Sequence, residues 1–341
     1  MKKLKGVGIG AGYFSQFHYD AWRRSDTAYI TALCDVSSQN AQKTASAHDI
    51  EKIYANAQEM LEKERPDFVD IITPPETHLE LCSLAANYGI PVICQKPFGG
   101  NLDTAKKIVR LFNEKNLRLI VHENFRFQPW FREIKSYMDK GLLGDRLHTL
   151  NFRLRTGDGW QEDAYMNRQP YFRTMEKLFV YETGVHYIDT FRYLAGEVKK
   201  VYAKLGRLNT NIKGEDLAWV HFEFANGTLG LLDANRYNEN TAQDPRYTFG
   251  EMLVEGNKGS IWLNADGSLV YKPLGQPETI VEYKKGKKGF AGDCVYAAQE
   301  HYMDCLLNNK TAESEGSLYL RNLEIQEAIY TSSAKGIPVS P

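Results

Sequence analysis

The first part of the chain alternates short apolar runs with longer amphipathic stretches. The apolar runs are Lys5–Ile9, Tyr29–Cys34, Phe68–Thr73, Pro91–Cys94 and Leu117–Val121. Helical spacing of apolar residues fills the intervals at Tyr13–Arg24, Ser38–Ala47, Ala57–Lys63, Glu76–Tyr88 and Leu102–Lys115. Short buried strands separated by helices predict a parallel sheet that is covered on both faces. The carboxyl ends of such strands form one edge of the sheet, where ligands bind.

After Val121 the pattern changes to alternating strands. A helix is expected near Pro129–Lys140, and strands are expected at Leu147–Arg155, Val198–Leu208, Ala218–Ala225, Thr228–Asn235, Tyr247–Glu255, Ser260–Asn264, Ser268–Lys272 and Thr279–Tyr283. Asn226-Gly227 and Asp266-Gly267 are hairpin signals between them. Further helices are expected at Tyr181–Leu194, Cys294–Leu307 and Leu318–Ala334.

These patterns predict an α/β Rossmann domain with a parallel sheet, followed by an α+β domain with a large, mostly antiparallel open-faced sheet. A chain of 341 residues exceeds what one hydrophobic core comfortably fills. We place the first domain at residues 1–122 and the second at residues 123–341.

Composition narrows the partners to small molecules. The formal net charge is −1, so there is no broad positive field for nucleic acid or an anionic membrane, and no apolar run is long enough to cross a bilayer. The five cysteines are widely spaced without a C-x-x-C pair, which favours reduced thiols and a cytoplasmic location. No residue cluster has the spacing of a metal site.

The opening segment carries a dinucleotide-binding fingerprint. Gly10-x-Gly12-x-x-Ser15 follows a predicted strand and opens a helix. The first glycine permits a tight turn, and the second lets the backbone approach a pyrophosphate at the helix N-terminus. Many tight turns contain glycines, so this pattern alone is weak evidence.

An acidic residue at the end of the second strand strengthens the cofactor prediction. Asp35 lies 25 residues after Gly10, where a carboxylate binds the adenosine ribose diol. No Lys or Arg occurs from Val36 to Gln42 to receive a 2′-phosphate, so NAD is favoured over NADP. The alternative interpretation is that Asp35 caps the following helix.

Several motifs occur together in a specific order. They are Thr73–His78 (TPPETH), Cys94–Pro97 (CQKP), Asn124–Pro129 (NFRFQP), Glu182–Asp189 (ETGVHYID) and the tail Ala328–Val339. Over nearly the whole chain this set resembles the glucose–fructose oxidoreductase/inositol dehydrogenase (Gfo/Idh/MocA) family, and faintly its branch that includes D-apiose dehydrogenases. Two positions depart from the family pattern, because Gln95 replaces the usual glutamate and Glu182 the usual aspartate.

The resemblance implies an NAD-dependent dehydrogenase that transfers a hydride between a sugar or polyol hydroxyl and the nicotinamide. It implies a cofactor site made by Gly10, Gly12, Tyr13, Phe14, Asp35, Thr73, Pro74, His78, Gln95 and Lys96. It also implies homodimers or homotetramers formed through the C-terminal sheet, which the sequence supports only through apolar positions such as Leu229, Leu231 and Val254.

Lys96, His186 and Glu182 are the candidate catalytic residues. A lysine at the end of a Rossmann strand can bind the substrate oxygen and relay its proton, and a histidine suits general acid/base work. Glu182, His186 and Asp189 are spaced to share one face of a helix. Without the motifs, the alternative interpretation is that Lys96 is a surface lysine in a loop and that His186 has a structural role.

The substrate site is expected to use hydrogen-bonding groups set against aromatic rings. The segment Arg153–Arg173 is dense in both, so it is a candidate wall of the sugar site or, alternatively, a solvated loop. The candidate substrate-binding residues are Lys96, Arg126, Arg155, Arg168, Glu182 and His186. His18 also recurs in the family, but its place within the first helix favours a structural role.

Two other classes of function fit the same residues. One is an NAD-dependent glycoside hydrolase of the same fold, which oxidises its sugar transiently. The other is a non-catalytic regulator that senses NAD or a sugar. Such regulators often lose the lysine or the histidine, whereas Lys96 and His186 are both present here.

Overall fold

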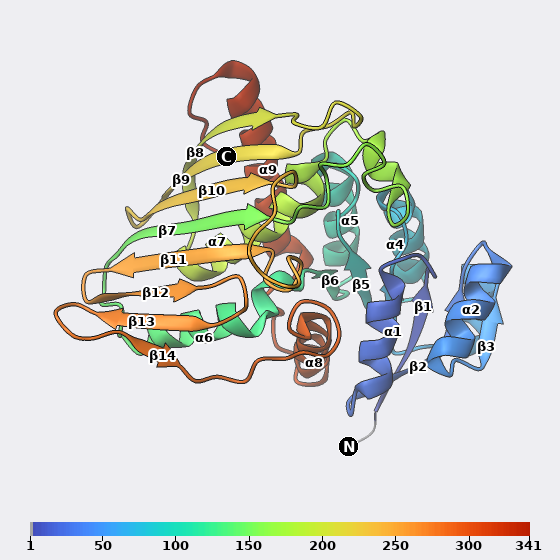
Figure 1. The fold of residues 1–341 in the computed structure, drawn as a ribbon. Helices are drawn as coiled ribbons and strands as arrows, with labels where there is room; N and C mark the ends of the chain where they lie inside the picture. Colours follow the sequence, from blue (N-terminus) through green and yellow to red (C-terminus); the bar gives the residue numbers. More distant parts are fainter. Residues whose placement is uncertain (1–2) are drawn as a thin grey trace. The chain divides into compact units, whose positions relative to one another are not determined.

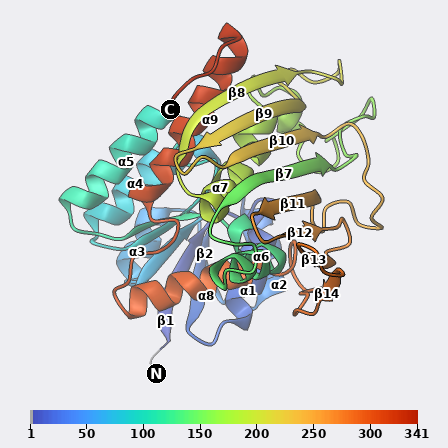
Figure 2. The same ribbon diagram turned by 90° about the vertical axis from the view of Figure 1, so that its left-hand side faces the viewer.

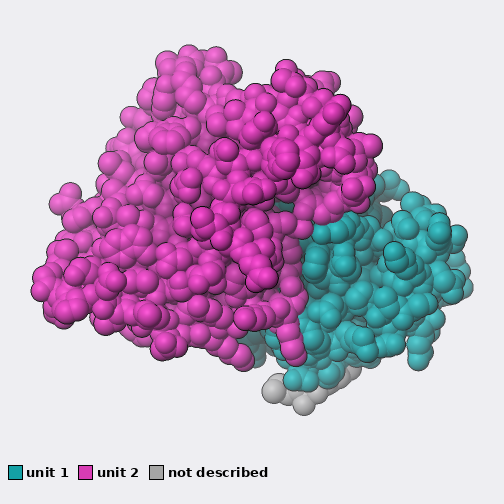
Figure 3. Space-filling model, viewed as in Figure 1, with its two compact units in different colours: residues 1–124, 295–323 teal, residues 125–294, 324–341 magenta. Residues whose placement is uncertain are grey.

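The computed structural model describes residues 3–341, and the chain divides into two compact units. Unit 1 contains the residues up to Asn124 together with Val295–Leu323, and unit 2 contains Phe125–Cys294 together with Glu324–Pro341 (Figure 3). Each unit has its own sheet, and the two sheets confirm the predicted fold class. The domain limits proposed from sequence, 1–122 and 123–341, stay a prediction.

Unit 1 is built on a six-stranded parallel sheet with the order β3-β2-β1-β4-β5-β6 (Figure 1). The strands are β1 (Leu4–Ile9), β2 (Ala28–Cys34), β3 (Lys52–Tyr54), β4 (Phe68–Ile71), β5 (Val92–Gln95) and β6 (Leu119–His122). The strand order reverses between β1 and β4, which is where dinucleotides bind in doubly wound sheets. The short strand β3 was not predicted, because three residues show no recognisable alternation.

Helices connect these strands. They are α1 (Ser15–Arg24), α2 (Ser38–His48), α3 (Ala57–Glu64), α4 (His78–Asn87), which follows a 3-10 turn η1 (Pro75–Thr77), and α5 (Leu102–Glu114). Helix α8 (Cys294–Leu307) belongs to this unit apart from its first residue, and α9 (Gly316–Lys335) is divided between the units. Strands β4, β5 and β6 are buried at every position, as expected for a sheet covered on both faces.

Unit 2 is built on an eight-stranded sheet with the order β14-β13-β12-β11-β7-β10-β9-β8. The strands are β7 (Leu147–Arg155), β8 (Val198–Gly206), β9 (Leu217–Phe224), β10 (Leu229–Asn235), β11 (Gly250–Gly256), β12 (Gly259–Leu263), β13 (Leu269–Pro273) and β14 (Thr279–Val281). Only β7 and β10 pair in parallel among them. The sheet is therefore mostly antiparallel, as predicted.

One face of this sheet is covered by helices α6 (Pro129–Asp139) and α7 (Val185–Ala195) with their neighbours (Figure 2). Buried side chains alternate along the strands, as in β9, and those on the covered face meet α7. Tyr187 packs on Phe152 with ring centroids 4.3 Å apart, and Phe191 packs on Phe222 at 5.2 Å. These aromatic contacts fix the helix that carries His186 against the sheet.

The described part of the chain has no helix that is both long and apolar enough to cross a membrane. All five cysteines are free thiols with buried side chains.

Candidate active site

The glycine turn after β1 leaves backbone exposed at the start of α1. Gly10 has a φ of 113°, and a Cβ there would lie 2.6 Å from the carbonyl oxygen of Ile72, so only glycine fits. A Cβ on Gly12 would meet nothing within 4 Å, and the side chain of Phe14, the N-cap residue of α1, makes no capping hydrogen bond. Open backbone at a helix N-terminus fits a pyrophosphate group. Of the neighbouring candidates, Tyr13 is 39% exposed and Phe14 is half-buried.

Asp35 is tied to this turn by its carboxylate. Oδ2 accepts the backbone N–H of Ala11 at 2.6 Å, and Oδ1 accepts that of Ser37 at 2.7 Å. The N-cap of α2 is Ser37, whose side chain accepts the N–H of Asn40. Asp35 is therefore not the capping residue, and its half-buried carboxylate stands at the end of β2 beside the glycine turn, where a ribose diol would bind.

His78 holds two loops together at the same edge of the sheet. Its Nε2–H donates to the carbonyl of Thr73 at 3.0 Å, and its Nδ1 accepts the N–H of Gly99 at 3.2 Å. Burial lowers the pKa of His78 to about 4, so the ring is neutral near pH 7. Thr73 meets Thr77 through their hydroxyl groups at 2.6 Å, and Pro74 is exposed.

Lys96 follows the last residue of β5 and is half-buried. The Lys96–Pro97 peptide bond is cis. The side chain of Gln95 accepts the backbone N–H of Lys96 through Oε1 at 2.6 Å, so this residue fixes the backbone that carries the lysine. The candidate cofactor residues of unit 1 thus follow β1, β2, β4 and β5, at the ligand-binding edge of the sheet.

In unit 2 the histidine helix begins with a π-helical turn, η4 (Phe179–Gly184). The Glu215 carboxylate accepts the N–H groups of Leu178 and Val180 at 3.1 and 3.0 Å, which fixes this start. The turn places Glu182 in π-helical backbone and His186 in α7, so the regular helix expected from Tyr181 is wrong at its first turn. π-helical turns are rare and frequently occur at functional sites.

His186 is held by an aromatic stack. Its ring lies 3.8 Å from the ring of Phe125 with an interplanar angle of 2°, and it is 4% exposed. Its backbone carbonyl also accepts the hydroxyl of Thr190 at 2.8 Å. The stack on Phe125 restricts the rotation of the imidazole, which suits a group that must meet a substrate in one orientation.

Asp189 and Arg126 form a buried bidentate ion pair. Nε and Nη2 of Arg126 donate to the Asp189 carboxylate at 2.6 and 2.7 Å, and the Asp189 side chain is 1% exposed. This pair ties the 3-10 turn η2 (Phe125–Phe127) to α7. Two donor groups of the Arg126 guanidinium are therefore used by the Asp189 carboxylate. A contact of Arg126 with substrate stays a prediction.

The two other candidate arginines are also paired with carboxylates. Arg155 donates to Asp233 Oδ1 at 2.7 Å, and Arg168 donates to Asp158 Oδ2 at 2.7 Å. Asp158 is shared with Arg236, whose Nη1 donates to the hydroxyl of Thr183 beside the π-helical turn. The segment Arg153–Arg173 is therefore linked through Arg236 to η4, while its residues 160–163 are exposed. Its role as a wall of the sugar site stays a prediction.

Glu182 places a negative charge near Arg236. The pKa of Arg236 is raised even though burial disfavours its charge, because Asp158, Tyr165 and Glu182 act on the guanidinium. Glu182 itself is half-buried. Unit 2 thus gathers Glu182, Arg168, Asp158 and Arg236 in one charged network.

Three residues that support the candidate site were not predicted from the sequence. Phe125 stacks on His186, Arg236 anchors Asp158, and Asp70 receives a hydrogen bond from His18 within unit 1. A signal existed for Asp70, since an acidic residue inside the apolar strand Phe68–Ile71 needs a buried partner. Phe125 lies in the motif Asn124–Pro129, but neither its stack on His186 nor the role of Arg236 could be predicted, because both are contacts with residues far along the chain.

Comparisons with known proteins agree with this architecture. The family model described as an oxidoreductase family with an NAD-binding Rossmann fold matches residues 5–123, and the GFO/IDH/MocA C-terminal domain matches residues 131–262. A D-apiose dehydrogenase of Paraburkholderia graminis is 32% identical and covers 98% of this chain and 89% of its own length. A myo-inositol 2-dehydrogenase of Thermotoga maritima is 27% identical over 96% of this chain and 90% of its own.

Among solved structures, an oxidoreductase from Agrobacterium radiobacter in complex with NAD+, L-tartaric acid and magnesium is similar with a TM-score of 0.92. It is 28% identical, and the match covers 99% of this chain and 98% of that one. The parallel sheet with its glycine turn and Asp35 defines an NAD-binding oxidoreductase. The chain belongs to the Gfo/Idh/MocA family.

Proposed function

We propose that the protein is an NAD-dependent dehydrogenase of a sugar or polyol. The observation that carries this proposal is Lys96 at the carboxyl end of β5, on the edge of the sheet that also holds the glycine turn and Asp35. The names of the D-apiose and myo-inositol dehydrogenases support a carbohydrate alcohol as the substrate. We place the reaction in the cytoplasm, in keeping with five free, buried thiols.

The proposed reaction divides its tasks among the candidate residues. Bound NAD supplies a carbon that accepts the hydride. Asp35 binds the ribose hydroxyls, and the open N-terminus of α1 binds the pyrophosphate. The Lys96 ammonium binds the substrate oxygen, and its charge stabilises the negative charge that develops there. His186 takes the hydroxyl proton as general base, and Glu182 orients the substrate.

The test replaces Lys96 by alanine and compares this variant with Lys107→Ala, which removes an exposed lysine of α5. Turnover is read by absorbance of NADH with a panel of aldoses and polyols. We expect Lys96→Ala to lose at least about 10²-fold in kcat, the contribution of a group that stabilises charge in the transition state, with NAD affinity changed less than about threefold. Full turnover in Lys96→Ala would reject the proposed role.

The same assay separates the dehydrogenase from the glycoside hydrolase alternative. A dehydrogenase accumulates NADH in proportion to the free sugar that is oxidised, whereas a redox-neutral hydrolase regenerates NAD in each turnover. A regulator would bind NAD or sugar without either outcome. The presence of both Lys96 and His186 favours the dehydrogenase over the regulator.

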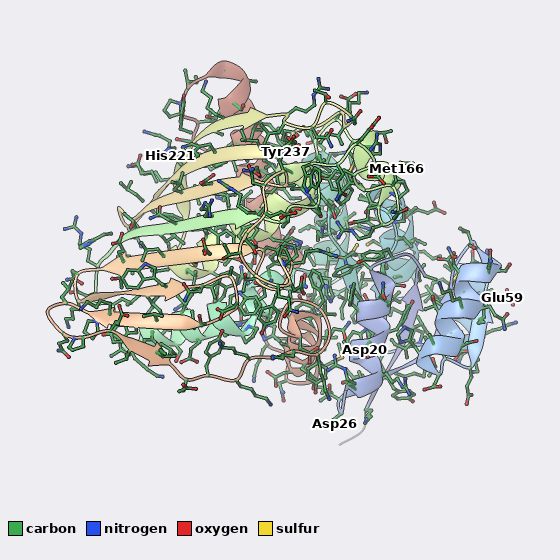
Figure 4. The ribbon with its side chains drawn as sticks, viewed as in Figure 1. Asp20, Asp26, Glu59, Met166, His221 and Tyr237 are labelled. Carbon is green, nitrogen blue, oxygen red and sulfur yellow. The ribbon has the colours of Figure 1, made fainter. Side chains whose placement is uncertain are left out.

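We also propose that the open face of the unit 2 sheet pairs with a second copy of the chain. Trp219 and Leu229 are 42% and 55% exposed on this face, and Nε1 of Trp219 donates to Nε2 of His221 at 2.8 Å. Figure 4 labels His221 on β9. Val254, expected here from sequence, is instead fully buried, because strand alternation turns it toward the helices. Sedimentation that shows only monomer at micromolar concentration would reject the pairing.

A further inference from the structure

A chain of buried polar side chains runs from the backbone of Lys96 into the core of unit 1. Gln95 accepts the Lys96 N–H through Oε1 at 2.6 Å, and its Nε2 lies 3.1 Å from Nε2 of His18. Nδ1 of His18 lies 2.8 Å from Oδ2 of Asp70. Gln95 is 7% exposed, and His18 and Asp70 are 0% exposed. Three buried polar residues thus connect the proposed catalytic lysine to one carboxylate.

The hydrogen bonds in this chain all have the same direction. Since Gln95 Oε1 accepts from Lys96, the other amide atom is Nε2–H₂, which can only donate. His18 Nε2 must therefore accept, so the ring carries its proton on Nδ1 and donates it to Asp70. Each donor points away from Lys96 and toward the carboxylate, which polarises the preceding bonds and strengthens them.

The surroundings hold His18 in place from several elements of unit 1. Trp22 Nε1 donates to the same Asp70 Oδ2 at 2.7 Å, and the ring of His122 from β6 lies 3.9 Å from the His18 ring. Gln299 of α8 donates to the backbone carbonyl of His18 at 3.4 Å. Because α1, β4, β6 and α8 all contribute, this site is rigid and the imidazole cannot turn to another partner.

We propose that His18 and Asp70 are positioning residues for Lys96, and that they act through the amide of Gln95. This inference rests on the proposed function of Lys96 and goes further. It assigns a role to His18, and it explains why an amide suits position 95 in this chain. The amide supplies the donor that the neutral His18 ring requires, while its oxygen holds the Lys96 backbone.

A carboxylate at position 95 cannot donate to His18 Nε2 as the amide does, and it needs a hydrogen-bond donor there instead. In a Gln95→Glu variant one oxygen still accepts the Lys96 N–H, but the other faces the lone pair of His18 Nε2. The introduced carboxylate and the His18 ring must then hold one extra proton between them to make the hydrogen bond. Raising the pH removes that proton and sets two acceptors against each other. The variant should therefore lose activity with rising pH where the parent does not.

The experiment uses the full-length protein with NAD and its best substrate from the panel, and measures kcat, KM and NAD affinity against pH. The variants are His18→Ala, Asp70→Asn, Gln95→Leu, Gln95→Glu and Lys96→Ala. The control is Arg118→Met, which removes the contacts of Arg118 with Glu315 and Lys310 in the same unit at the amino end of β6. Thermal unfolding of each variant sets the temperature at which all are folded.

We expect His18→Ala, Asp70→Asn and Gln95→Leu to lower kcat by about 10- to 100-fold, as loss of supporting hydrogen bonds does at other sites, with NAD affinity changed less than about threefold. Gln95→Glu should approach parental kcat at low pH and lose it as pH rises. The groups that face His18 are Asp70, Gln95 and His122, and the pH profile of the parent is the baseline for that of Gln95→Glu.

The outcomes separate the two proposals. If Lys96→Ala keeps full turnover, the proposed function fails. If Lys96→Ala is inactive but His18→Ala and Gln95→Leu match Arg118→Met in kcat, the positioning role is refuted. A Gln95→Glu profile parallel to that of the parent refutes the assigned proton positions.

Discussion

Replacement of Asp158 by asparagine removes the charge that balances a buried arginine in unit 2. The Arg236 side chain is 7% exposed, and its guanidinium lies 5.1 Å from the ring centroid of Tyr165 and 5.2 Å from that of Phe172. Asp158 is also the partner of Arg168 and accepts the hydroxyl of Thr156 at 2.7 Å. The asparagine has nearly the same shape, so the substitution changes charge and hydrogen-bonding pattern with little change in packing.

The substitution should lower the free energy of unfolding strongly, because two cations share the Asp158 carboxylate. Breaking a buried ion pair by removal of one partner costs about 3–5 kcal/mol, since the other charge stays buried without compensation. In a domain of about 150–250 residues, the size range of unit 2, each kcal/mol lowers Tm by about 2–4 °C. We therefore expect Asp158→Asn to lower the Tm of this unit by roughly 6–20 °C.

The loss should depend on pH in a defined direction. Burial raises the pKa of Asp158, but Arg236 and Arg168 outweigh it and hold the pKa well below its usual range. A carboxylate with a lowered folded pKa stabilises the protein above its unfolded pKa of about 3.9, and this contribution is lost as pH falls below that value. The difference in stability between parent and Asp158→Asn should therefore narrow below about pH 4.

Calorimetry or circular dichroism at several pH values measures the effect, and Asp163→Asn is the control because Asp163 is an exposed aspartate of the same segment. The double variant Asp158→Asn/Arg236→Met removes the uncompensated charge as well, so it should be destabilised less than the sum of the single variants. A Tm for Asp158→Asn equal to that of Asp163→Asn at pH 7 would show that the ion pair contributes nothing.

Two further results are expected in unit 1. Asp35→Ala should weaken NAD binding far more than NADP binding in titration calorimetry, because only NAD presents a free ribose diol to the carboxylate. Asp26→Ala is the control, since Asp26 is exposed (Figure 4). Equal losses of NAD and NADP affinity in Asp35→Ala, or a similar loss in Asp26→Ala, would contradict the assignment. The pKa of His78 is lowered to about 4, so the parent protein loses stability as pH falls from about 6.5 to 4. His78→Gln should make stability depend less on pH in this range. Parallel curves of stability against pH for the parent and the variant would refute this prediction.

Local pattern determined the fold class and the cofactor edge of this protein. The apolar run Lys5–Ile9, the glycines at 10 and 12 and the acidic Asp35 are close in sequence, and their arrangement follows from strand, turn and helix geometry alone. The alternation along β7 likewise gave its bounds, Leu147–Arg155, without error. Such features lie within one strand–turn–helix–strand unit, so a single sequence displays them directly.

Contacts between distant residues were decided only by tertiary structure. Gln95 meets His18 across 77 positions, and Arg236 meets Asp158 across 78. The identity of each residue says that it can donate or accept a hydrogen bond, but not which partner the folded chain brings within reach. The direction of the hydrogen bonds from Lys96 to Asp70 is therefore a property of the packed core, because burial removes water and leaves each polar group only the partner that the fold supplies.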